Sequence, residues 1–255
     1  HPVLAEAVTQ FQAQAYKELL PADGPVRAQI MGAISPEKQD QAHRVKDFMN
    51  YQLMDQMKEY EPEFDQMLFY LPLTGSTFKK VYYDELLGRA VSKFIQAEDL
   101  IVPYTANSLD DAEAIVHVIR MSKNDLRKQQ VGGFYKDIEL GEPPIEENQI
   151  KAKQLELEGV TANDQQRENM YTILEVHTVL DLEDYPDIDE NNEPTGIKLP
   201  YIITIDEASQ NVLSIRRNYD EEDPLKKKKN YFVQFKFLPG TGFYGFGLIH
   251  MIGGL

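Results

Sequence analysis

The sequence predicts an α+β protein, with a helical N-terminal part followed by an antiparallel, strand-rich part. Three observations lead to this prediction: apolar residues recur at steps of three and four in the first quarter, the period changes to two from Thr77, and turn signals separate the strand-like runs of the last third. The connectors are short, which favours antiparallel pairing because a parallel pair needs a long crossover. We therefore expect a mainly helical segment at 1–75, a mixed segment of small strands and helices at 76–160, and a strand-rich segment leading into a helix at 161–255.

Two helices are expected in the first quarter. The first covers 2–20 and ends at "PADGP"; the second begins with Ser35 as N-cap and Pro36 at the first helical position. The second helix carries an apolar stripe, and five of the eight methionines lie in this part of the chain. We interpret both as ordinary core, with a surface that packs against a partner as the alternative. The stripe is Val45, Met49, Leu53 and Met57, and the methionines are Met31, Met49, Met54, Met57 and Met67.

The middle of the chain predicts short strands and helices. The strand candidates are "TFKKVYYD", "GRAVSKFI", "LIVPY" and "EAIVHVIRM". A helix is expected at "SKNDLRKQQVGGF", capped by Ser122 and ended by Gly132, and another at "PPIEENQIKAKQLELEGV".

The last third predicts a meander or a set of hairpins. Its strand candidates are "MYTILEVHTVLDL", "LPYIITID", "NVLSIRRNY" and "YFVQFKF", joined by turn-rich segments that include "EASQ" and "DEEDPLKKKKN". Alternation in the first of these strands places Glu175, His177 and Asp181 on the face opposite the leucines.

Composition narrows the classes of function. The formal net charge of -16 argues against a protein that grips a phosphate backbone over a broad surface. Cysteine is absent, which excludes disulfides, thiol nucleophiles and thiolate metal sites. No apolar run approaches the ~18 residues that span a bilayer, so we expect no membrane partner. The chain begins at His1 and stops at Leu255 within an apparent helix, so we expect it to be part of a longer polypeptide.

Gly240, Gly242 and Gly245 form a G-x-G-x-x-G pattern between a strand-like and a helix-like run. A dinucleotide-binding fold needs a parallel strand before this pattern and an acidic residue ~20 positions later. The strands before it look antiparallel, and the chain ends before such an acid. We interpret the motif as a structural loop that needs positive φ and close backbone approach, and we expect no cofactor.

An acidic stretch at 181–194 contains seven carboxylates and no basic residue. Read as a calcium loop, it places Asp187 and Asp189 at ligand positions one and three, but Asn192 and Lys198 stand where the loop needs glycine and a bidentate acid. A solvated acidic loop is therefore the preferred interpretation, and no metal site is assigned.

The one basic run follows four acids in a predicted hairpin connection. We prefer a solvated turn tip and keep the run as a candidate nucleic-acid contact. Its members are Lys226, Lys227, Lys228 and Lys229.

The five histidines stand alone in the sequence, with no H-E-x-x-H pattern, and there is no G-x-S-x-G pattern. No catalytic residue is assigned, and each histidine is expected to be a packed or surface residue. They are His1, His43, His117, His177 and His250.

Five phrases of the sequence together resemble the portal, or head-to-tail connector, proteins of tailed bacteriophages, in particular those of the short-tailed type. They lie between residues 18 and 255 and cover most of the chain, and none is a catalytic signature. The phrases are "ELLPADGPVRAQI", "LFYLPLTGSTFKKVYYDELLGRAVSKFI", "EDLIVPYTA", "NDLRKQQVGGFYKDIEL" and "FLPGTGFYGFGLIHMIGGL".

The resemblance implies a non-enzymatic subunit of a dodecameric ring at one vertex of the capsid. Double-stranded DNA passes through the channel of such a ring, and the terminase large subunit, capsid protein and tail adaptor proteins dock on it. The implied location is the virion, after assembly in the host cytoplasm. Two alternatives remain open: another phage structural protein, such as a tail adaptor or scaffold, and a fragment of an enzyme whose site lies outside this segment.

Overall fold

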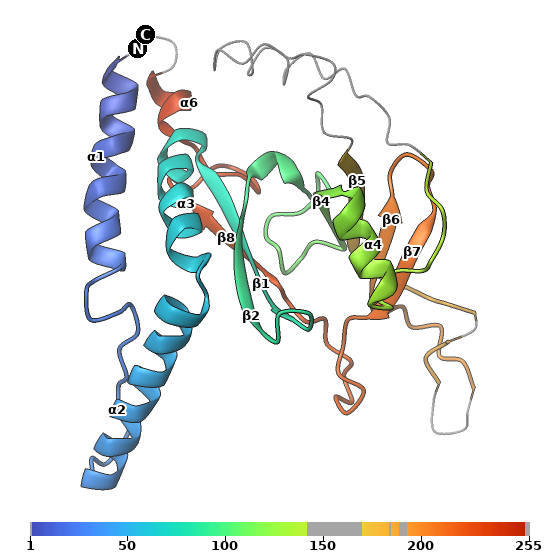
Figure 1. The fold of residues 1–255 in the computed structure, drawn as a ribbon, viewed down its shortest axis with the longest axis horizontal. Helices are drawn as coiled ribbons and strands as arrows, with labels where there is room; N and C mark the ends of the chain where they lie inside the picture. Colours follow the sequence, from blue (N-terminus) through green and yellow to red (C-terminus); the bar gives the residue numbers. More distant parts are fainter. Residues whose placement is uncertain (1, 142–169, 184, 189–192, 253–255) are drawn as a thin grey trace. The chain divides into compact units, whose positions relative to one another are not determined.

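The computed structural model describes residues 2–141, 170–183, 185–188 and 193–252 (Figure 1). It confirms the α+β class, with helices in the N-terminal part followed by antiparallel sheets. The chain forms two compact units, each assembled from separate stretches of sequence. Unit 1 comprises His1–Glu98, Thr105–Asp111 and Asn230–Leu255, and unit 2 comprises Asp99–Tyr104 and Ala112–Lys229.

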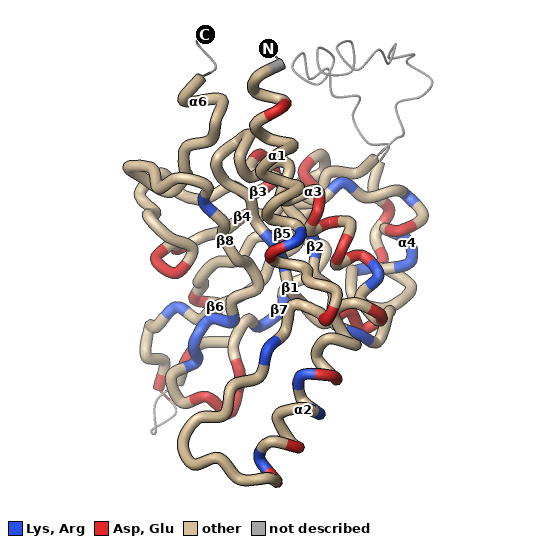
Figure 2. Tube along the Cα trace, turned by 90° about the vertical axis from the view of Figure 1, so that its left-hand side faces the viewer, with Lys and Arg blue, Asp and Glu red and all other residues tan. Residues whose placement is uncertain are grey.

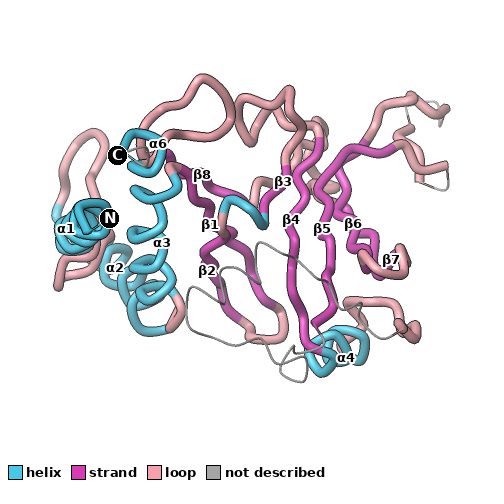
Figure 3. The backbone as a smooth tube through the Cα atoms, turned by 90° about the horizontal axis from the view of Figure 1, so that it is seen from above, coloured by secondary structure: helices cyan, strands magenta, loops and turns pink. Residues whose placement is uncertain are grey.

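Unit 1 is a three-stranded antiparallel sheet covered by helices. The strand order is β2-β1-β8, so the last strand of the chain pairs with the first. Helix α3 packs on β1 and β2, and α1 packs on α3 (Figure 3). The elements are α1 (Pro2–Leu19), α2 (Pro36–Tyr51), the π-helix η1 (Gln52–Gln56), α3 (Tyr60–Thr74), β1 (Ser76–Asp84), β2 (Arg89–Ile95), β8 (Phe232–Lys236) and α6 (Leu248–Ile252).

The core of unit 1 lies between α1, α3 and the sheet. Phe64, Met67 and Leu68 of α3 are buried there with Leu20. Arg89 of β2 donates two hydrogen bonds to the Glu59 carboxylate, at 2.7 and 2.8 Å, which ties the start of α3 to the sheet. This bidentate arrangement is the strong form of an arginine–carboxylate pair.

Unit 2 is built on a five-stranded antiparallel sheet in the order β3-β4-β5-β6-β7. Leu126 of α4 packs on Tyr171 and Ile173 of β5, and these residues form the core with Leu213. The elements are β3 (Leu100–Ile101), β4 (Ala114–Ser122), α4 (Lys123–Val131), β5 (Met170–Leu180), β6 (Leu199–Asp206) and β7 (Val212–Arg217); the 3-10 turn η2 (Ala97–Asp99) precedes β3.

Most of the expected elements are present. Ser35 caps α2, its side chain accepting a hydrogen bond of 3.3 Å from Lys38 N, and Ser122 caps α4 in the same way at 3.1 Å. The predicted meander is confirmed for β5, β6 and β7. The predicted helix at 143–160 lies outside the described residues.

Two expectations about the strands are wrong. The segment "LIVPY" contributes only the two residues of β3. Strand β8 does not continue the meander after β7, because it pairs with β1 in the other sheet, from Ser76↔Lys236 to Lys80↔Phe232. A local sequence pattern indicates that a segment is a strand, but it does not indicate which sheet the strand joins.

Candidate functional site

The glycine motif is a structural loop that joins β8 to α6. Leu238 and Phe246 form an isolated antiparallel bridge across it, and Gly245 N donates a 2.7 Å hydrogen bond to Ser76 Oγ. A Cβ at Gly245 or at Gly247 would overlap backbone atoms at the C-terminal end of α3. The predicted close backbone approach is therefore confirmed.

The predicted need for positive φ is wrong for the three motif glycines, since Gly240, Gly242 and Gly245 all lack it. The positive φ belongs to their partner Gly75, at +88°, where α3 ends. The strand before the motif is antiparallel, as expected, so the motif lacks the setting of a dinucleotide fingerprint.

The lysine run does not occupy a hairpin tip, because the strands on either side of it belong to different sheets. Lys226 forms an ion pair with Asp187, and Lys228 Nζ donates a 3.3 Å hydrogen bond to Ala112 O. Lys227 and Lys229 are exposed. The run is thus partly engaged in holding loops of unit 2 together.

Part of the acidic stretch lies outside the described residues, including Asp189. Asp187 accepts a 2.6 Å hydrogen bond from Thr195 Oγ1 in addition to its ion pair with Lys226, and these partners lower the pKa of Asp187. A carboxylate held by a lysine and a threonine has a structural role as a loop anchor.

A row of polar residues that the sequence did not predict crosses the sheet of unit 2. His117, Glu175, Thr204 and Ser214 stand directly opposite one another on β4, β5, β6 and β7. Directly opposite residues share a face of the sheet. His177, on the same face, lies 2.7 Å from Glu175, between Nε2 and Oε1.

The middle of the polar row is buried, and its two ends are partly buried. Thr204 and Glu175 are 0% and 7% exposed, His117 and Ser214 are partly buried, and the neighbouring His177 is 4% exposed. The hydroxyls of Thr204 and Ser214 have no hydrogen-bond partner among the described residues. The row lies on the face of the sheet that also carries the core residues Tyr171 and Ile173.

The sequence suggested that all five histidines are isolated, and this expectation is wrong for two of them. His177 contacts Glu175, and β-sheet pairing brings His117 opposite the same glutamate from 58 positions earlier in the numbering. His43 is exposed, the His250 ring accepts a 3.0 Å hydrogen bond from Gly247 N, and His1 lies outside the described residues. The only signal in the sequence was the E-x-H alternation in β5.

Helix α2 exposes apolar residues, and none of its residues is buried. Val45, Phe48 and Met49 lie on one helical face and are 47%, 59% and 43% exposed. We call these three residues the α2 stripe. The core interpretation is therefore wrong for Val45 and Met49 of the predicted stripe and for Met31, which is 84% exposed. It is confirmed for Met57 and Met67, which are 5% and 1% exposed.

The other side of α2 is covered by its own preceding segment. Asn50 accepts a 2.9 Å hydrogen bond from Val26 N and donates to Asp23 O at 3.2 Å. Ala42, Lys46 and Asn50, at steps of four, are the partly buried positions of this side. Phe48 points away from this side, whereas Met49, seven residues after Ala42, lies at its edge. All three residues of the α2 stripe are still at least 43% exposed, so the segment before α2 does not cover them.

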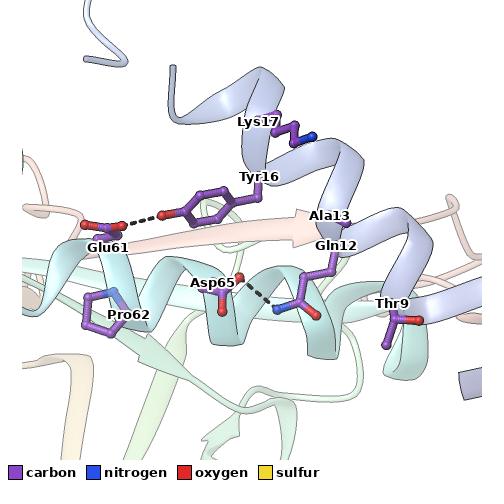
Figure 4. Close-up of a pocket in the computed structure, with 8 residues that line it drawn as sticks. All are labelled: Thr9, Gln12, Ala13, Tyr16, Lys17, Glu61, Pro62 and Asp65. Atoms are coloured by element: carbon purple, nitrogen blue, oxygen red, sulfur yellow. Dashed lines mark hydrogen bonds between the residues drawn. The ribbon is translucent and has the colours of Figure 1, made fainter. Parts of the chain in front are cut away.

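A groove of about 570 Å³ runs between α1 and α3 (Figure 4). Two carboxylates line it: Glu61 accepts a hydrogen bond from Tyr16 OH, which raises the pKa of Tyr16, and Asp65 accepts one of 2.8 Å from Gln12. We call this feature the α1–α3 groove. It is lined by Thr9, Gln12, Ala13, Tyr16, Lys17, Glu61, Pro62 and Asp65.

The partners of the two groove carboxylates are neutral side chains. No ion pair of the described residues includes Glu61 or Asp65. The groove contains one cation, Lys17. It therefore presents carboxylate charge beside exposed apolar surface, which suits a partner that is apolar and positively charged at its edge.

Within the described ranges, no group of three or more His, Asp or Glu residues could hold a metal ion. None of the helices in that part of the chain is long and apolar enough to cross a membrane.

A scan against protein-family models found no match, and a search of curated proteins found no significantly similar sequence.

Proposed function

We propose that this chain is part of a portal protein of the short-tailed bacteriophage type. In this proposal, copies assemble as a ring at a capsid vertex, double-stranded DNA passes through the channel, and the terminase large subunit, capsid protein and tail adaptors bind to it. The observation that carries the proposal is the set of portal-like phrases over residues 18–255.

The way in which two of those phrases meet supports the proposal. Residues 68–95 supply the end of α3, β1 and β2, and residues 237–255 supply the glycine loop and α6. They are far apart in the sequence, yet Phe237 N donates a 3.0 Å hydrogen bond to Gly75 O. The two phrases therefore form one packed junction.

The charge of the chain also supports a conduit. A net charge of -16 disfavours a tight grip on phosphates, and a lining that held DNA would oppose its passage. Acidic residues are found along the traces of both units (Figure 2). An exposed apolar helix face such as the α2 stripe is a feature of assembly subunits.

Two other proposals are separated from this one by their behaviour in solution. A tail adaptor or scaffold would differ in its oligomeric state. An enzyme fragment would require reacting groups outside the described residues, and a nucleotide-binding assay on the complete protein would reveal one such class.

The complete protein is expected to form a closed ring with rotational symmetry. Each subunit of a heterologous ring uses two different patches, so truncation to residues 1–255 should weaken the ring without unfolding the subunit. Multi-angle light scattering and electron microscopy would measure this. Monomers alone over a wide concentration range would rule out the portal proposal.

We expect the 255-residue chain to bind duplex DNA no better than the ~10⁻⁴ to 10⁻⁶ M of non-specific binding. Four lysines engaged with phosphates would give a log-log salt slope near -3.6, at about -0.9 for each neutralised phosphate. Lys226 and Lys228 already have protein partners, so the slope should be shallower. Fluorescence anisotropy at several salt concentrations would measure it.

The control for this prediction is the variant with all four lysines of 226–229 replaced by alanine, which should bind DNA almost as the parent does. Nanomolar binding at physiological salt that disappears in this variant would instead identify the run as a DNA grip.

A further inference from the structure

We propose that the α2 stripe of one copy of this chain docks in the α1–α3 groove of a second copy. This inference rests on the ring proposed above and names two surfaces that would meet in it. Both surfaces belong to unit 1.

The α2 stripe has the properties of a buried contact without a cover in its own chain. Phe48 is its most exposed member, at 59%, and shares one helical face with Val45, three residues before it, and Met49, one residue after it. The segment before α2 covers the opposite side through Asn50. Exposed aromatic residues of this kind act as anchors in protein interfaces, where they fill a pocket on the partner.

Charge distinguishes the stripe side of α2 from its other side. Figure 2 shows basic and acidic residues along α2, and the 100° step between successive residues gives the side of the helix on which each one lies. Lys38 and Arg44 border the stripe with one acid, Glu37, near the helix start. Asp40 and Asp47 lie further round; the contact of Arg44 with Asp40 is 4.0 Å long and both side chains are highly exposed, so it holds Arg44 weakly.

The α1–α3 groove complements this surface. Its exposed surface is mostly apolar, and among the described residues its carboxylates Glu61 and Asp65 accept hydrogen bonds from the neutral side chains of Tyr16 and Gln12. An apolar stripe bordered by Lys38 and Arg44 matches an apolar groove that carries two acids.

The two surfaces are different patches of the same subunit, so their pairing is heterologous. Such a contact leaves a free stripe at one end of a pair and a free groove at the other. It therefore propagates to a ring when the rotation closes, which is the assembly that the proposed function requires.

The test uses the complete protein and two variants. Phe48→Glu places a negative charge in the stripe, and Ala13→Arg places a bulky cation at an exposed position of the groove while leaving Gln12 and Tyr16 in place. Each is expected to weaken self-association by at least about tenfold. The matched controls, His43→Glu on α2 and Gln14→Arg on α1, change exposed residues outside both surfaces and should assemble as the parent does.

Mixing the two variants is the decisive step. The Phe48→Glu copy keeps an intact groove and the Ala13→Arg copy keeps an intact stripe, so a 1:1 mixture should form heterodimers that grow no further. Mass photometry would detect them, and circular dichroism would establish that each variant is folded.

The outcomes separate the two proposals. If the unmodified protein remains monomeric, the ring proposal falls and this inference falls with it. If the unmodified protein forms rings and both variants form them equally well, the ring stands and the stripe–groove contact is wrong. Loss of assembly in both variants without heterodimers in the mixture would also overturn the pairing, because the two surfaces would then bind different partners.

Discussion

Replacing Gly75 with alanine is expected to destabilise unit 1 by about 3 kcal/mol or more. Gly75 ends α3 with a φ of +88°, and a Cβ there would overlap the backbone of Phe246 and Gly247. The left-handed backbone contributes about 1–2 kcal/mol of this cost, and the overlap supplies the rest, because backbone atoms cannot move aside as a flexible side chain can. Thermal and urea denaturation would measure the loss.

Gly88 and Gly242 provide matched controls. Gly88 also has a positive φ, +64°, but a Cβ there would meet no atom within 4 Å, so Gly88→Ala should cost only about 1 kcal/mol. Gly242 has neither a positive φ nor a neighbour within 4 Å, and Gly242→Ala should be nearly neutral. Equal effects at all three positions would contradict the close contact between Gly75 and the glycine loop. Saturable binding of ATP or NAD that Gly242→Val abolishes would contradict the interpretation of the glycine motif as a structural loop.

Lys79→Met is expected to stabilise unit 1 by about 1–3 kcal/mol at pH 7. Lys79 is 4% exposed, and its Nζ has no hydrogen-bond partner among the described residues. It lies over the rings of Tyr60 and Phe64, 4.4 and 4.9 Å from their centroids, which offsets only part of the cost of burying a charge. Methionine would keep the apolar stem and remove the charge.

The pH dependence identifies the cause. Burial lowers the pKa of Lys79 to about 8, from 10.5 in an exposed lysine, against the opposing effect of Glu63 and Glu59. Between these values the unfolded chain binds more protons than the folded one, so this residue makes stability rise with pH from about 8 to 10.5. Below pH 8 the penalty is present in full, and above 10.5 it is absent.

The stability difference between Lys79→Met and the parent should therefore be largest near pH 7 and shrink as the pH approaches 10.5. Urea denaturation at several pH values would measure this difference. Hydrogen exchange in peptides of α3 and β1 as the readout would report the stability of unit 1 specifically. A difference that stays constant over this range would show that packing, and not the lysine charge, is responsible.

Local signals in the sequence determined much of the secondary structure. Helix α2 begins at Ser35 and Pro36, and helix α4 lies between Ser122 and Gly132, as predicted. These ends were predictable because capping depends on residues within one helical turn. The meander of β5 to β7 was predictable for a similar reason, since short connectors restrict neighbouring strands to antiparallel pairing. The α+β class follows from the change of period, which needs no knowledge of contacts.

Only the tertiary structure decided what depends on residues distant in the chain. The pairing of β8 with β1 joins Gly75 to the glycine loop, and strand register brings His117 beside Glu175; no pattern within a short window contains either contact. The α2 stripe has the same periodicity as a stripe in a core. A 3.6-residue period shows that one face of a helix is apolar, but it does not show which element, if any, covers that face. Burial is a property of the whole fold, so the exposure of Phe48 and the burial of Lys79 could be known only once the other elements were in place.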